Sequence, residues 1–144
     1  MVRKFTTGAA LAGLALALGF LPVQAQTGAT TLETGTFHGQ VHNTSGRATI
    51  YREADGKLVL RLTHFKTSNG PDVHVILIAD KDADDNANFL KSGTERVELG
   101  TLKGNEGDQN YDIPAGTDLG RFQTVSIYCE RFNANFGAAP LKKF

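Results

Sequence analysis

The stretch KLVLRLTHF, residues 57–65, alternates between two faces of an extended chain. One face carries Leu58, Leu60 and Leu62, and the other carries Val59, Arg61, Thr63 and Phe65. This period of two predicts a β-strand with a buried leucine face, because a helix repeats its apolar residues every three or four positions. The stretch therefore places the chain among β proteins.

The same period recurs on both sides of this stretch. It is found in GRATIYRE (46–53), DVHVILIA (72–79) and QTVSIYCERF (123–132), and in the shorter candidates TFHGQVH (36–42) and ERVELG (95–100). Asp55-Gly56 is a hairpin signal between the first of these and KLVLRLTHF. Short strands separated by turn residues predict an all-β single domain, an antiparallel β-sandwich or barrel-like fold. Only residues 80–92 are compatible with a helical turn.

The side chains of two of these strands bear on function. In DVHVILIA, Val73, Val75 and Leu77 lie opposite Asp72, His74, Ile76 and Ile78. In QTVSIYCERF, Val125, Ile127 and Cys129 lie opposite Thr124, Ser126, Tyr128 and Glu130. The pattern points Cys129 inward and places Asp72 beside His74, where a carboxylate can orient an imidazole.

The first residues predict export. A basic start with Arg3 and Lys4 precedes an uncharged apolar run over residues 8–21, then Pro22 and small residues ending at Ala25. This is the pattern of a signal peptide over residues 1–25. The run is shorter than the roughly 20 residues of a membrane anchor. We expect a secreted or periplasmic protein without a membrane span after cleavage, a flexible lead-in over residues 26–34, and a β domain over residues 35–144.

The charge balance argues against nucleic-acid binding. The sequence has 15 basic and 15 acidic residues, and cleavage of the leader removes two of the basic ones. No cluster of lysines and arginines offers a phosphate-binding surface. The catalytic motifs of hydrolases, nucleotide-binding enzymes and zinc proteases are absent from the sequence. We therefore expect an accessory domain more than an enzyme.

The sequence partly matches two kinds of metal site. Residues 80–86, DKDADDN, space their aspartates like a calcium loop, but Asp85 and Lys91 stand where the loop needs glycine and glutamate. We interpret this segment as a solvated acidic loop, with calcium binding as the open alternative. A blue-copper site does not fit, because no histidine follows Cys129 and the only methionine is Met1. The sequence predicts no metal site.

Cys129 is the only cysteine, so the chain cannot form an internal disulfide. Its position on an apolar strand face favours an inert core residue. The alternative is a functional thiol, because an unpaired cysteine in an oxidising compartment is a liability unless it is buried or used.

Several blocks resemble the electron-transfer DM-thirteen domain family. They are GTFHG (35–39), HNTSGRATIY (42–51), LRLTHFKTSNGPDVHVIL (60–77), VELGTLKGNEGDQNYDIP (97–114) and VSIYCERFNANFGAAPL (125–141). The resemblance implies a β-rich extracytoplasmic module with a redox role. In that family the hallmark cysteine corresponds to Cys129, acting as a bare thiol or as a ligand to a prosthetic group such as haem.

The resemblance leads to the function we expect from the sequence. It is an electron-transfer accessory module centred on Cys129, with Asp72 and His74 as nearby partner groups and His42 as a weaker candidate for cofactor binding. Its redox partner would be a separate protein or a small ligand. The alternative is a non-catalytic ligand-binding or adhesion β-sandwich in which Cys129 is structural and the loops 80–88 and 103–110 make the contacts.

Overall fold

The computed structural model describes residues 28–84 and 93–144, and within these ranges every regular element is a strand. The strands are β1 (Thr30–Thr36), β2 (His38–Gly39), β3 (Ser45–Arg52), β4 (Leu58–Lys66), β5 (Val73–Ile78), β6 (Arg96–Thr101), β7 (Gln109–Ile113), β8 (Thr124–Cys129), β9 (Ala134–Pro140) and β10 (Lys142–Lys143). No helix in the described residues is long and apolar enough to cross a bilayer.

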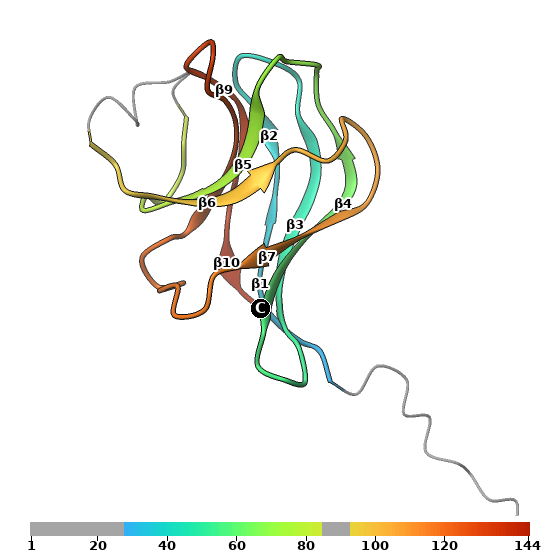
Figure 1. The fold of residues 1–144 in the computed structure, drawn as a ribbon, viewed down its shortest axis with the longest axis vertical. Helices are drawn as coiled ribbons and strands as arrows, with labels where there is room; N and C mark the ends of the chain where they lie inside the picture. Colours follow the sequence, from blue (N-terminus) through green and yellow to red (C-terminus); the bar gives the residue numbers. More distant parts are fainter. Residues whose placement is uncertain (1–27, 85–92) are drawn as a thin grey trace, which may run out of the picture.

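The strands form two antiparallel sheets of five strands each, packed as a sandwich (Figure 1). The first sheet has the order β10-β1-β3-β4-β7, and the second has the order β2-β9-β8-β5-β6. The predicted all-β sandwich is confirmed. The Asp55-Gly56 hairpin is also confirmed, since Arg52 pairs with Leu58 and Gly56 adopts a φ of 88°.

One apolar core fills the space between the sheets. It joins Ala48, Ile50, Leu60, Leu62 and Phe65 of the first sheet to Val75, Leu77, Val125, Ile127 and Cys129 of the second. The strand alternation predicted this inner face for all of these residues except Phe65.

Phe65 differs because β4 contains a bulge. The pairing steps from Arg47↔Thr63 to Ser45↔Lys66, so two residues of β4 oppose the single Gly46 of β3. The extra residue is His64, which has a φ of 49°. One added residue reverses the alternation, and Phe65 turns into the core.

The N-terminal lead-in is shorter than the sequence predicts. Residues 30–34, which the sequence predicts to be flexible, belong to β1 and pair with β3 and β10. The threonines at these positions favour an extended chain, and the open edge of β3 supplies the partner. Residues 1–27, which include the predicted signal peptide, lie outside the described residues.

A second, smaller apolar cluster covers part of the outer face of the second sheet. It contains Ile76, Ile78, Tyr128, Ala138 and Ala83. Ala83 comes from the acidic segment, whose backbone accepts hydrogen bonds from Thr124 and Asn135. Residues 80–84 therefore lie over this sheet, while the rest of the predicted helical turn, residues 85–92, falls outside the described ranges.

Candidate functional site

Cys129 is the last residue of β8 and lies on the inner face of the second sheet. It pairs with Val73 of β5 and Ala134 of β9, and its exposed fraction is 0%. Val125 and Ile127 belong to the same core cluster. The inward orientation predicted from the alternation is confirmed, and the thiol is free of any disulfide.

This burial bears directly on haem binding. A thiolate that ligates haem iron needs an open face on the sulfur wide enough for the porphyrin. In this structure the Cys129 side chain is enclosed by the apolar core between the sheets. The residues around Cys129 therefore do not fit a haem in this conformation.

The turn after Cys129 is held by three hydrogen bonds. The amide of Glu130 donates to the carbonyl of Asp72 over 3.0 Å, and the amide of Asn133 donates to the carbonyl of Glu130 over 3.2 Å. The Tyr128 hydroxyl also donates to the side-chain oxygen of Asn133. Cys129 is thus one residue away from a surface turn in which Phe132 is 64% exposed.

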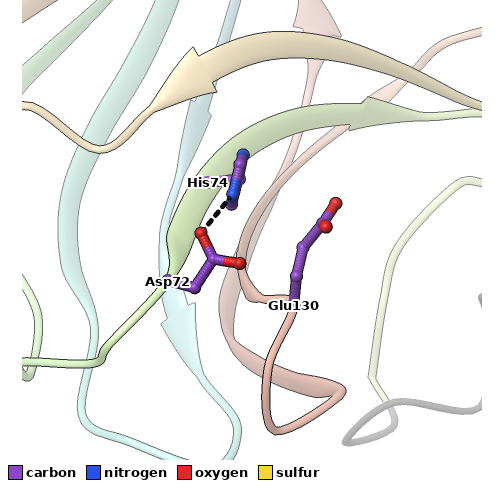
Figure 2. Close-up of side chains that lie close together, drawn as sticks. All are labelled: Asp72, His74 and Glu130. Atoms are coloured by element: carbon purple, nitrogen blue, oxygen red, sulfur yellow. Dashed lines mark hydrogen bonds and ion pairs between the residues drawn. The ribbon is translucent and has the colours of Figure 1, made fainter.

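A polar cluster occupies the opposite, outer face of the same strands. The two ring nitrogens of His74 contact carboxylates, with Nε2 2.7 Å from Oδ1 of Asp72 and Nδ1 2.5 Å from Oε1 of Glu98. Asp72 precedes β5, and Glu98 lies on the neighbouring edge strand β6. The predicted contact between Asp72 and His74 is confirmed, and Figure 2 shows it.

Two opposing effects act on the charge of His74. Partial burial disfavours the imidazolium, and the hydrogen bonds to Glu98 and Asp72 favour it. The hydrogen bonds prevail and raise the pKa of His74 above its ordinary value of 6.5. A cation is therefore favoured at the centre of this cluster.

Glu130 joins the cluster from the end of β8. One oxygen of its carboxylate, one of Asp72 and a ring nitrogen of His74 all lie within 4.8 Å of one another. Figure 2 shows the three side chains on the same side of the sheet. The guanidinium of Arg96 on β6 holds Glu130 in an ion pair of 3.0 Å.

The strand pairing places the Cys129 thiol and the imidazole of His74, which the sequence predicts to be neighbours, on opposite faces of the sheet. Val73 pairs with Cys129, and His74 pairs with Tyr128. Directly paired residues point to the same side of a sheet, so His74 and Cys129 point to opposite sides. Asp72 and His74 are brought together, but on the face away from the thiol.

The other candidate residues have different neighbours. His42 packs edge-on against Phe136, with ring centroids 4.3 Å apart. In the acidic segment, Asp82 accepts from its own loop and contacts Nε2 of His38 over 2.6 Å. Positions 85 and 86 of the calcium-like loop lie outside the described residues.

Sequence reasoning missed three members of the cluster: Glu98, Glu130 and Arg96. The strand alternation predicts that Glu130 lies on the same face as Tyr128, so the sequence did indicate which way Glu130 points. Glu98 and Arg96 come from an edge strand whose register against β5 includes a bulge. That register could not be read from one sequence.

The family comparison decides the identity. A model described as Electron transfer DM13 matches residues 36–141. The chain belongs to the Electron transfer DM13 family. This membership supports a redox or electron-transfer module, in agreement with the resemblance of the sequence blocks. The comparisons with curated proteins and with solved structures found no match.

Proposed function

We propose that this DM13 chain is an exported redox module whose reactive group is the Cys129 thiol, reached through local opening of the turn at residues 130–133. One observation carries the proposal: Cys129 is the only sulfur-containing residue after Met1, and it ends a core strand directly before a surface turn. If the chain carries out thiol redox chemistry, the Sγ atom of Cys129 is therefore the only candidate for the reactive atom.

A single thiol restricts the reaction. The Cys129 thiolate would attack one sulfur of a partner disulfide, form a mixed disulfide and release the other sulfur as a thiolate. A thiol of a separate dithiol donor then attacks the Cys129 sulfur, which releases the first sulfur of the partner as a thiol, and the second thiol of the donor displaces Cys129 as the donor closes to a disulfide. Two electrons pass from the donor dithiol to the partner disulfide, and Cys129 returns to the thiol. The partners are therefore a dithiol donor and a disulfide acceptor, each a separate protein or a small ligand.

Local opening of the turn at residues 130–133 would reach the thiol without global unfolding. The turn is fastened by the hydrogen bonds of Glu130, Asn133 and Tyr128 described above. Each such bond contributes about 1 kcal/mol, so a local opening costs a few kcal/mol, less than a typical free energy of unfolding. The basic and apolar start of the sequence supports placing this reaction outside the cytoplasm.

A second function is favoured by a different observation. The 0% exposure of Cys129 fits a structural core residue in a non-catalytic binding or adhesion module. In that case the loops at residues 80–84 and 103–110 would make the contacts.

One measurement separates the two functions. The reduced protein is mixed with a chromogenic disulfide, and the rate of thiol release is followed across a series of urea concentrations below the unfolding transition, with Cys129→Ala as the blank. Redox use predicts labelling in water with a weak dependence on urea, because local opening exposes little surface. Labelling that follows the full urea dependence of global unfolding would refute redox use and favour the structural role.

A further inference from the structure

We propose that Asp72, His74 and Glu130 form a binding site for a divalent transition-metal ion, with Zn²⁺ as the representative ion. This site goes beyond the thiol chemistry proposed above and does not depend on it. It rests on three ligand atoms from two adjacent strands that already lie within 4.8 Å of one another. Zn²⁺ binds imidazole nitrogen and carboxylate oxygen at about 2.0–2.2 Å, so a small closing movement of these side chains is sufficient.

The imidazole of His74 is held in the orientation that metal binding needs. Metal-binding histidines usually donate their second ring N–H to a carboxylate, which fixes the tautomer and the ring plane. Glu98 provides this carboxylate at Nδ1, 2.5 Å away. Nε2 then faces Asp72, one of the two proposed oxygen ligands.

The charge of the cluster also favours a cation. Asp72, Glu98 and Glu130 bring three carboxylates around one imidazole, and Arg96 forms an ion pair with Glu130. A divalent ion would replace the proton at Nε2 of His74 and offset the two carboxylate charges that Arg96 does not balance, so binding should release a proton. Binding would draw Glu130 away from Arg96, so Arg96 competes with the metal for this ligand.

The ligand set selects among metals. Ca²⁺ takes six to eight oxygen ligands, and Mg²⁺ demands an octahedron of oxygens. One imidazole with two carboxylates suits Zn²⁺ and similar ions better, and leaves a fourth position for water or a small ligand. We therefore expect Zn²⁺ to bind in the presence of excess Ca²⁺ and Mg²⁺.

The test is calorimetric titration of Zn²⁺ into the full, untagged chain after treatment with a chelator. All titrations use the Cys129→Ala background as well as the natural chain, because a free thiol can itself bind Zn²⁺. We expect one ion per chain with the same affinity in both. Loss of binding in the Cys129→Ala chain would overturn the proposal and assign the metal to the thiol.

Four substitutions locate the ion. Glu130→Gln and His74→Gln should each weaken binding at least tenfold, and Glu98→Gln should weaken it about 10- to 100-fold through the orientation of the imidazole. His38→Gln is the matched control, because His38 also contacts an aspartate, Asp82, and is not a proposed ligand. It should bind Zn²⁺ like the natural chain.

Arg96→Gln gives a test in the opposite direction, since it removes the competitor for Glu130. We expect tighter Zn²⁺ binding, by several-fold. Thermal melting of each variant verifies folding, and Glu130 is exposed enough that its substitution leaves the core unchanged. Equal affinity in Glu130→Gln, Glu98→Gln and the natural chain, or an equal loss in His38→Gln, would overturn the site.

Discussion

Cys129 and His74 lie on opposite faces of the same pair of hydrogen-bonded strands. Cys129 pairs with Val73 and enters the core, whereas His74 pairs with Tyr128 and lies on the outer face. The side chains therefore cannot meet without breaking the pairing of β5 with β8. Any influence of the His74 cluster on the thiol passes through the backbone, where Glu130 donates to the carbonyl of Asp72.

The reactivity of the thiol therefore depends on how reagents reach it, and not on side-chain contacts with the His74 cluster. A buried thiol reacts only when the structure opens, and under the proposed function this opening occurs at the turn of residues 130–133. The contact between Tyr128 and Asn133 is the side-chain bond that closes this turn.

We predict that Tyr128→Phe accelerates labelling of Cys129 in native buffer. The substitution removes the hydroxyl that donates to Asn133 and keeps the ring in its apolar cluster. Loss of one hydrogen bond costs about 1 kcal/mol, which corresponds to roughly a fivefold increase in the open population. The measurement is the rate of thiol release from a chromogenic disulfide without denaturant.

Tyr111→Phe is the control for this prediction. Tyr111 is also buried and hydrogen-bonded, to Gln109 and Lys103, but it lies on β7 of the other sheet. We expect it to lower global stability with little effect on labelling. Equal acceleration by both substitutions would mean that the thiol is exposed only by global unfolding.

The sequence was sufficient to predict which side chains of β5 and β8 enter the core between the sheets. Alternation in DVHVILIA and QTVSIYCERF assigned Val73, Val75, Leu77, Val125, Ile127 and Cys129 to the core, as observed. It succeeded because the inner positions of both strands carry only apolar residues and cysteine, whereas the outer positions, although largely buried as well, include polar residues. The same alternation predicted the contact between Asp72 and His74.

The bulge in β4 and the full membership of the His74 cluster could not be predicted, because both depend on how neighbouring strands pair. The bulge at His64 inserts a residue and turns Phe65 inward, and nothing in KLVLRLTHF marks its position. Glu98 reaches His74 from a third strand, so its place depends on the register between strands. His74 was predicted to be a partner of the thiol, but the register decides otherwise. Val73 pairs with Cys129, so His74, one residue further along, points to the other face of the sheet.

The bulge at His64 depends on Gly46, and we predict that Gly46→Ala is strongly destabilising. Gly46 has a φ of 113°, and a methyl group there would come within 2.8 Å of the Cα of Phe65 and of the Thr63 carbonyl oxygen. Backbone strain alone costs about 1–3 kcal/mol, and the backbone contacts add to it. We expect a loss of about 3 kcal/mol or more, measured by urea denaturation.

Gly56→Ala separates strain from crowding. Gly56 also has a positive φ, of 88°, but an added methyl group would meet nothing within 4 Å. Its cost should be about 1 kcal/mol, from strain alone. If the two alanine variants are equally stable, the close approach at Gly46 does not contribute.

The surroundings of Cys129 predict an order of stabilities among its substitutions. In a sealed apolar core, Cys129→Ala loses only the packing of the sulfur, at about 1 kcal/mol. Cys129→Ser buries a hydroxyl in the same place, at about 1–3 kcal/mol if it finds no partner. Urea denaturation should therefore rank serine below alanine, whereas the reverse order would indicate a polar or hydrated pocket around the thiol.

Glu33 predicts a pH dependence of stability. It is 8% exposed, it pairs with the core residue Ile50, and one oxygen of its carboxylate lacks a hydrogen-bond partner within the described residues. Burial raises the pKa of Glu33 above its ordinary value of 4.5, although Lys143 partly opposes the shift. Above 4.5 and up to the raised pKa, the folded chain holds more protons than the unfolded chain.

The free energy of unfolding should therefore fall as the pH rises through that window, and remain lower above it. Glu33→Gln removes the buried charge, so we expect it to be more stable than the natural chain at pH 7, by on the order of 1 kcal/mol. The difference should vanish below pH 4.5, where the carboxyl is neutral in both states. Glu53→Gln, at an exposed carboxylate on the hairpin after β3, should change stability by less than about 0.5 kcal/mol at either pH. A Glu33→Gln variant that loses stability at pH 7 would show that the charged carboxylate is stabilised within the fold, through Lys143 or bound water.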